Sequence, residues 1–477
     1  MISIDSSTRS FFLTARLGIV TGLVYFLGTL YWVANVMQMY GGITMWVAAL
    51  IALLLASYLS LYVVLFVLLL RESIRWHGVG GIWLAPAFWV AMEWLRSTVG
   101  GGFPWVLLGS SQATVLPVAQ LASVTGIYGL SLLVALVSTA AAGLAVSQRS
   151  TDQRGAIAVA VLLVVVVGLG SWRISRGSLL ESGAPLRVGL VQGNVDQNVK
   201  YDARFRDEIL RRYIDLSRRV IGEGAELVIW PEASTPFYFE ADAAMAAPIR
   251  RLATEARTPF LMGTDEFAPG GNGSPDRYYN SAVLIGPDGL TRGNYRKMHL
   301  VPFGEYVPLK RMLFFVGPLI EAVSDFSSGA EPVVFDADGR RVSVSICYES
   351  VYPSISRSFV LRGSALLATI TNDAWFGDSS AAYQHFEQGA LRAIEEGRYV
   401  VRAANTGISG AVDPYGRVLV TTKLFEPAAV TVNVRLLTGR TIYSYTGDVV
   451  AWFALGATAG FVIYRLRSRS RRILRQP

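Results

Sequence analysis

Three short segments of the sequence contain residue types that together could carry out covalent catalysis. The first places Glu232 directly after an apolar run that ends in Trp-Pro. The second holds Lys297 and, eight residues later, Glu305. The third holds the only cysteine of the chain, Cys347, with Glu349 two residues beyond it. A thiol, a carboxylate and an amine are the groups that acyl transfer through a cysteine requires.

A cysteine nucleophile reacts as its thiolate, so it needs a base that takes its proton. A partly buried glutamate can do this, because desolvation raises the pKa of a carboxyl group toward neutrality. A lysine nearby would favour the thiolate and stabilise the oxyanion of an acyl-transfer intermediate. Glu232, Lys297 and Cys347 therefore make a coherent set. Taken singly, each also fits a structural role: a capped carboxylate, a surface lysine and a small buried thiol.

Other kinds of site have less support in the sequence. The histidines His77, His299 and His385 are scattered, without the spacing of metal ligands. No serine lies in a Gly-x-Ser-x-Gly elbow, although spacing alone leaves a Ser-His-Asp triad open. One cysteine cannot form an internal disulfide, so an oxidising compartment is neither required nor excluded.

Residues 172–446 alternate short apolar runs with amphipathic segments, which is typical of a layered α/β fold. Strands are predicted at 186–192, 226–230, 259–263, 279–285, 342–347, 365–371, 400–404 and on either side of a turn within 412–420. Helices are predicted at 204–221, 246–256 and 384–396. The notable polar residues follow strands, where α/β folds place their sites.

The rest of the chain has the composition of a membrane protein. Hydrophobic residues make up 52% of the chain and charged residues 16%, against about 25% charged in soluble domains. This composition also excludes intrinsic disorder and a disulfide scaffold. Six spans are predicted, at 17–36, 43–70, 82–95, 119–146, 156–172 and 449–464. The predicted parts are a membrane bundle at 1–171, a globular domain at 172–446, and a final span with a basic tail at 447–477.

The distribution of arginines predicts the orientation of these spans. The loops on one side and the tail are basic, whereas the opposite loops carry almost no charge; the basic side holds Arg9, Arg16, Arg71, Arg75, Arg149 and Arg154. The positive-inside rule then places both termini in the cytoplasm and residues 172–446 on the outer face. The basic tail is thus interpreted as a topology anchor and not as a nucleic-acid site.

Several motifs resemble those of known families. The segments 230–232, 297–305 and 346–349 resemble the Glu-Lys-Cys motifs of the nitrilase superfamily. With membrane spans on both sides, the chain resembles more narrowly the apolipoprotein N-acyltransferase family, over essentially its whole length. Further matching segments are Gly-Phe-Pro-Trp at 102–105, Val-Gln-Gly-Asn at 191–194, Asn-Asp-Ala-Trp-Phe-Gly at 372–377 and Ala-Asn-Thr-Gly at 404–407.

The resemblance implies a membrane enzyme with an αββα nitrilase-like sandwich and a ping-pong reaction. Cys347 would be the nucleophile, Glu232 the general base and Lys297 the stabiliser of the transition state. A phospholipid would donate its acyl chain to the thiol, and the α-amine of a diacylglyceryl-cysteine apolipoprotein would accept it. No metal or organic cofactor and no nucleic acid are implied. We expect a monomer in the bacterial inner membrane, with its catalytic domain in the periplasm.

The resemblance also implies supporting roles. Glu305 would orient the lysine or act as a second base, and Tyr348 and Glu349 would shape the pocket. Phe314 and Phe315 lie in an apolar segment, 310–326, which we interpret as a mobile lid that enters the outer leaflet. A core helix is the alternative for this segment.

Two features of the sequence depart from the family pattern. About two of the usual eight spans are missing at the N-terminus, and Tyr201 follows Lys200 where tryptophan is frequent.

Two other functions are alternatives to the acyltransferase. One alternative is a membrane-tethered nitrilase-type amidase that uses water as acceptor. The other is a transporter or scaffold with a degenerate outer domain. The apolar segment 310–326 and the many spans disfavour the amidase, and the complete catalytic trio disfavours the scaffold.

Overall fold

The structure is a computed structural model that describes residues 6–146, 149–270, 275–302, 304–306 and 325–473. Phe314 and Phe315, which were assigned to the lid, lie outside the described residues. The chain divides into two compact units. The first comprises Met1–Asn35, Ile43–Ser175 and Tyr445–Pro477, and the second comprises Val36–Gly42 and Arg176–Ser444.

The first unit is helical, and the described chain contains five helical runs long and apolar enough to cross a membrane. They are Arg9–Thr29, Met45–Gly101, Ala122–Val146, Ser150–Glu181 and Val449–Ser468. Helices suit such a sequence because lipid offers the backbone no hydrogen-bond partners, so each segment must satisfy its own. These runs indicate a membrane protein.

The predicted second and third spans both fall in the run Met45–Gly101. It consists of α3 (Met45–His77), the 3₁₀ segment η1 (Gly78–Leu84) and α4 (Ala85–Thr98). Helix α4 packs against α3, and Gly78 between them has a positive φ of 64°. The run is therefore two segments. Helix α4 has 14 residues and a length of about 21 Å, shorter than the hydrocarbon core of about 30 Å.

The described residues outside the sandwich form further long and short helices. The long ones are α1 (Ser6–Thr29), α6 (Ala122–Val146), α7 (Ser150–Arg176) and α15 (Val449–Ile473). The shorter ones are α2 (Trp32–Gly41), α5 (Leu116–Ala119), α8 (Ser178–Glu181) and α14 (Ile442–Thr446).

The second unit contains two six-stranded sheets that pack face to face. The first has the order β12-β1-β2-β3-β4-β5, with bounds Ala428–Leu436, Ala184–Gln192, Leu227–Ile229, Phe260–Ala268, Arg277–Ile285 and Thr291–Arg296. The second has the order β11-β10-β9-β8-β7-β6, with bounds Val418–Thr421, Gly410–Val412, Val400–Ala404, Leu366–Thr371, Arg341–Ile346 and Phe335–Asp336.

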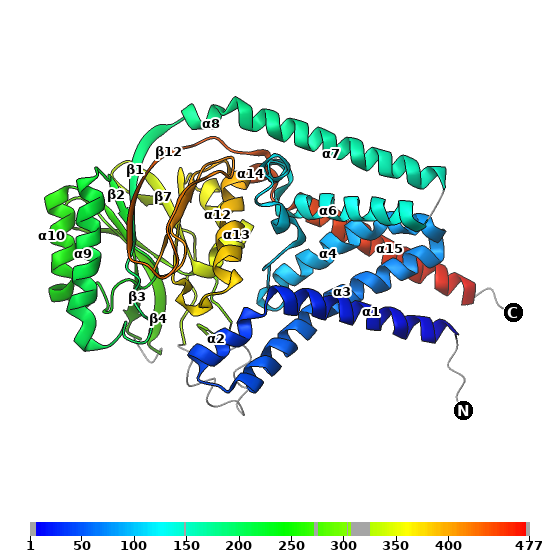
Figure 1. Cartoon of the computed structure of the whole chain (residues 1–477), viewed down its shortest axis with the longest axis horizontal. Helices are drawn as coiled ribbons and strands as arrows, with labels where there is room; N and C mark the ends of the chain where they lie inside the picture. Colours follow the sequence, from blue (N-terminus) through cyan, green and yellow to red (C-terminus); the bar gives the residue numbers. More distant parts are fainter. Residues whose placement is uncertain (1–5, 147–148, 271–274, 303, 307–324, 474–477) are drawn as a thin grey trace. The chain divides into compact units, whose positions relative to one another are not determined.

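Helices cover the outer faces of both sheets (Figure 1). Helices α9 (Arg206–Gly222) and α10 (Ala243–Ala256) lie on the first sheet, and α12 (Pro353–Leu361) and α13 (Ser380–Glu396) lie on the second. The predicted αββα sandwich is confirmed. Strands β1, β2 and β3 are mutually parallel, as are β7, β8 and β9. Their buried, apolar residues are typical of strands covered on both faces.

Four elements of the sandwich were not predicted from the sequence: β5, β6, β12 and α12. Strand β5 matters most, because Lys297 follows it. Its sequence, Thr-Arg-Gly-Asn-Tyr-Arg, is too polar to show an apolar pattern. It is a strand because it pairs with β4, with Ser281 opposite Arg296 and Ala282 opposite Tyr295. Pairing of an edge strand is a tertiary effect that local sequence does not reveal.

Candidate active site

Glu232 lies just beyond β2 and is held on both carboxylate oxygens. The backbone N–H of Asn372 donates to its Oε2 at 2.8 Å, and Asn280 Nδ2 donates to its Oε1 at 2.6 Å. The preceding Trp230 is fully buried and stacks on Tyr213 with ring centroids 4.8 Å apart. The residue is only 6% exposed, so these contacts determine where its carboxylate points.

Lys297 follows β5 and forms ion pairs with two carboxylates. Its Nζ lies 2.8 Å from Glu305 Oε1 and 3.4 Å from Glu232 Oε1, and the residue is 1% exposed. Its backbone N–H donates to the carbonyl of Asn280 at 2.8 Å. Glu305 is fixed in turn by the backbone N–H of Val301, at 2.8 Å from its Oε2.

Asn280 is a further member of this site, and it was not predicted from the sequence. Its Nδ2 donates to Glu232 and also to Glu305, at 2.8 Å from Oε1. It lies in the middle of β4, and nothing in its sequence surroundings distinguishes it from an ordinary strand residue. The amide joins two carboxylates that would otherwise repel each other, and so it helps to keep both of them beside the lysine.

The charge state of Lys297 follows from two opposing effects on its pKa. Burial by itself would lower the pKa of the ammonium group, but the carboxylates of Glu305 and Glu232 outweigh burial and raise it above the ordinary value. Lys297 is therefore a fixed cation at neutral pH. Such a preorganised charge can stabilise a developing oxyanion without reorganisation.

Cys347 directly follows β7, at the start of the 3₁₀ segment η5 (Cys347–Val351). Its backbone is left-handed, with φ of 51°, which is uncommon for a residue other than glycine. The residue is 8% exposed. Burial raises the pKa of the thiol, the charge of Glu232 raises it further, and Lys297 only partly opposes them. The resting thiol is therefore neutral and needs a base before it can attack.

Glu349 is buried and forms hydrogen bonds with residues of both sheets. Its Oε1 accepts from Tyr295 Oη at 2.8 Å and from the backbone N–H groups of Met298 and His299 at 2.7 and 3.1 Å. Its Oε2 accepts from the backbone N–H of Ile346 at 2.8 Å. Met298 follows Lys297 and Ile346 precedes Cys347, so this buried carboxylate ties together the segments that carry the lysine and the thiol.

We predict a pH-dependent contribution of Glu349 to stability, because burial raises its pKa from 4.5 to about 7. A carboxyl group with a raised pKa in the folded state adds stability at acidic pH, and this contribution is lost as pH rises through the folded pKa. Glu349→Gln cannot titrate. The wild-type free energy of unfolding should therefore decline relative to that of the variant between about pH 4.5 and 7, by at most about 1.4 kcal/mol per pH unit. Denaturant unfolding in detergent would measure this difference, and a flat difference would contradict the prediction.

Tyr348, the other residue expected to shape the pocket, is also buried. Its ring packs edge-to-face on Tyr352 with centroids 5.2 Å apart and lies 5.9 Å from the ring of His299. Tyr201, which stands where tryptophan is frequent, lines a cavity of about 730 Å³ with Thr235, Phe237, Tyr238 and Asp265 among others. The Tyr201 hydroxyl donates to Asp265 Oδ2 at 2.9 Å. Aromatic side chains thus line a cavity whose size is within the usual range for ligand sites.

The fold and the site define a class of protein: a nitrilase-type enzyme domain joined to membrane helices. Consistent with this, the family model for carbon-nitrogen hydrolase matches residues 187–442. The model for the apolipoprotein N-acyltransferase N-terminal domain matches residues 1–140. An amidase of the nitrilase superfamily from Nesterenkonia is similar at 20% identity, over 56% of this chain and 94% of that one, with a TM-score of 0.41.

Two relatives narrow the class to a family. Apolipoprotein N-acyltransferase of Geobacter metallireducens is 39% identical over 461 residues, which cover 95% of this chain and 87% of the relative. Apolipoprotein N-acyltransferase of Methylococcus capsulatus is 37% identical over 381 residues, which cover 79% and 72%. The chain belongs to the apolipoprotein N-acyltransferase family.

Proposed function

We propose that this protein transfers an acyl chain from a membrane phospholipid to the α-amine of a diacylglyceryl-cysteine lipoprotein, through a thioester on Cys347. The observation that carries the mechanism is that three buried residues lie close together at the ends of β2, β5 and β7. They are Glu232, which would be the base, the cation Lys297, and Cys347, the only thiol of the sequence. The interaction of Cys347 with both Glu232 and Lys297 supports this assignment.

In the first half-reaction, Glu232 takes the proton from the Cys347 thiol as the sulfur attacks the ester carbonyl of the phospholipid. Lys297 stabilises the negative charge that develops on the carbonyl oxygen. The carbon–oxygen bond to the glycerol then breaks, and the protonated Glu232 returns the proton to the departing alkoxide. The products are a thioester and a lysophospholipid.

In the second half-reaction, the neutral α-amine of the lipoprotein attacks the thioester carbonyl. Glu232 removes a proton from the attacking nitrogen, and Lys297 again faces the oxyanion. The carbon–sulfur bond breaks, and the thiolate leaves and recovers its proton from Glu232. The products are an N-acylated lipoprotein and the free thiol, so the enzyme is ready for another cycle.

Intact-mass spectrometry of the protein after incubation with phospholipid tests this proposal. We expect a mass increase of one acyl group on Cys347, released as an amide when a diacylglyceryl-cysteine peptide is added. A persistent absence of the adduct would contradict the thioester mechanism. An adduct that decays only to free fatty acid, with or without the peptide, would instead support the amidase-like hydrolase.

We further propose that the catalytic domain of the monomer faces the periplasm and that the basic loops are cytoplasmic. A cysteine at the exposed Lys423, in the Cys347→Ala background, should react with a membrane-impermeant maleimide in intact spheroplasts. The matched control is Arg154→Cys in the same background, which should react only after lysis. The reverse pattern would overturn the orientation and, with it, access to a periplasmic lipoprotein.

A further inference from the structure

A buried polar cluster, separate from the proposed catalytic trio, contacts the backbone carbonyl of Cys347. It consists of His385 on α13, Asp373 just beyond β8, and Arg402 on β9, each at most 3% exposed. Arg402 Nη2 lies 2.7 Å from Asp373 Oδ2 and 2.9 Å from His385 Nδ1, and that ring nitrogen is 3.0 Å from Asp373 Oδ1. Burying three such groups is costly, so their arrangement calls for a function.

The cluster contacts the nucleophile through its backbone. His385 Nε2 lies 3.1 Å from the carbonyl oxygen of Cys347 and 3.0 Å from Ser350 Oγ, so a proton on Nε2 can donate to either oxygen. The other ring nitrogen, Nδ1, faces both the Arg402 guanidinium and the Asp373 carboxylate. Burial lowers the pKa of His385, and the charge of Arg402 lowers it further, so the ring stays neutral. Ser350 Oγ donates to the same Cys347 carbonyl at 3.0 Å.

This carbonyl belongs to the residue whose backbone is left-handed. A residue other than glycine holds such a conformation only where its surroundings over-determine it, at a cost of order 1–3 kcal/mol. His385 Nε2 and Ser350 Oγ, which lie 3.0 Å apart, both contact this carbonyl and together restrain that peptide group. The backbone angles set the direction of the Cα–Cβ bond of Cys347, so these contacts also restrict where the sulfur can lie.

The same loop restrains the base. Three consecutive residues at and after the end of β8 act on different parts of the site. The Thr371 hydroxyl lowers the pKa of the Cys347 thiol and donates to Asp373 Oδ1 at 2.8 Å. The backbone N–H of Asn372 donates to Glu232 at 2.8 Å, and Asp373 joins the His385 cluster. One short segment therefore acts on both the proposed proton acceptor and the thiol that loses the proton.

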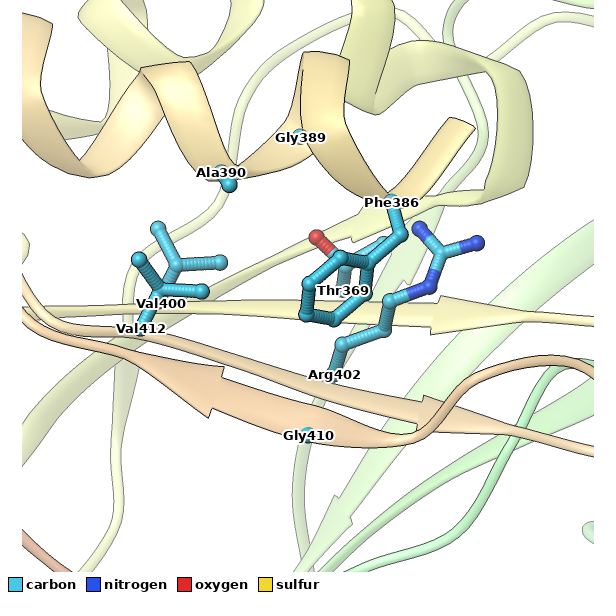
Figure 2. Close-up of a pocket in the computed structure, with 8 residues that line it drawn as sticks. All are labelled: Thr369, Phe386, Gly389, Ala390, Val400, Arg402, Gly410 and Val412. Carbon is cyan, nitrogen blue, oxygen red and sulfur yellow. The ribbon is translucent and has the colours of Figure 1, made fainter. Parts of the chain in front are cut away.

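We infer that His385, held by Asp373 and Arg402, is a positioning residue that fixes the left-handed backbone of Cys347 and aligns its sulfur with Glu232. The inference rests on the proposed thioester mechanism. Figure 2 shows Arg402 extending from its strand toward the helix that carries Phe386, beside a cavity of about 10 Å³. That space is far below the 300–1,000 Å³ of ligand sites, so this end of the cluster is a packed support and not a second binding site.

The test compares His385→Leu with His385→Gln in single-turnover acylation by phospholipid. Leucine removes the donor to the Cys347 carbonyl, whereas the glutamine amide can replace it. A misplacement of about 1 Å can cost about 10²-fold in rate, so we expect a loss of about that size in the maximum acylation rate for leucine. The lipid concentration at half-maximal rate should not change, and glutamine should recover most of the rate.

A second variant disturbs the cluster without removing any of its groups. A Cβ at Gly407 would lie 2.3 Å from Asp373 Oδ2, so Gly407→Ala must displace that carboxylate. We expect the same selective loss of maximum rate. The matched control is Gly222→Ala, where the added Cβ meets nothing within 4 Å and the acylation rate should equal that of the wild type.

The outcomes separate this inference from the proposed function. If the wild type forms no acyl-enzyme, the thioester mechanism fails. If the wild type acylates and His385→Leu acylates equally fast per folded molecule, the positioning role is refuted. A loss in both His385 variants that follows only the fraction of folded protein, determined by thermal unfolding, would also refute it and leave a purely structural role.

Discussion

Replacing Cys347 with alanine is expected to abolish acyl transfer while the protein remains folded and inserted. The chain has no other thiol, so no second group can form the thioester. Alanine and cysteine have a similar steric cost in the left-handed region, which makes Cys347→Ala a conservative change for the backbone at this position. Mass spectrometry of a diacylglyceryl-cysteine peptide and of released lysophospholipid would measure both half-reactions.

Cys347→Ser is the companion variant. It keeps a hydroxyl in place of the thiol, but a hydroxyl is a far weaker nucleophile without a matched activating base. We expect both variants to unfold at temperatures close to that of the wild type and to show no acyl adduct. Full transferase activity in Cys347→Ala would end the thioester mechanism.

Glu232→Gln is expected to lower the rate of acyl-enzyme formation by about 10²–10⁴-fold, the usual contribution of general-base catalysis. This loss should occur although the substitution makes the thiol more acidic. The charge of Glu232 raises the pKa of Cys347, so removing it lowers that pKa. Lys297→Met should have the opposite effect on the thiol, because Lys297 lowers the same pKa, and it should also slow acylation by removing the charge that faces the oxyanion.

Alkylation of Cys347 by iodoacetamide across a pH series would separate the two effects. The rate rises with pH as the thiolate forms, so the profile should move to lower pH in Glu232→Gln and to higher pH in Lys297→Met. Phospholipid acylation should be slow in both. If Glu232→Gln acylated at the normal rate, the base would lie elsewhere, and Glu305 is the next candidate because it shares both Lys297 and Asn280.

The sequence by itself was sufficient to predict the fold class and the segments with chemical character. Apolar runs of membrane length determine helices, because lipid leaves the backbone no other hydrogen-bonding partners. Apolar strands alternating with amphipathic helices determine a layered α/β domain. Glu232 and Cys347 could be identified as site candidates because each follows such a buried strand, and polar residues at those strand ends are typical of sites in this class.

The tertiary structure decided which residues surround these candidates. Strand β5, which places Lys297, exists through its pairing with β4, and its own sequence is too polar to indicate a strand. Asn280 bridges two carboxylates 48 and 25 residues away in sequence, and Glu349 contacts backbone about 50 residues earlier.

His385 shows the same limit most clearly. It is one of three scattered histidines in the sequence, with no spacing that indicates a role. In the fold, it lies between a carboxylate 12 residues before it and the carbonyl of Cys347 38 residues before it. Such contacts arise from the packing of α13 on the second sheet. Local sequence patterns do not predict them, because they depend on which distant segments pack together.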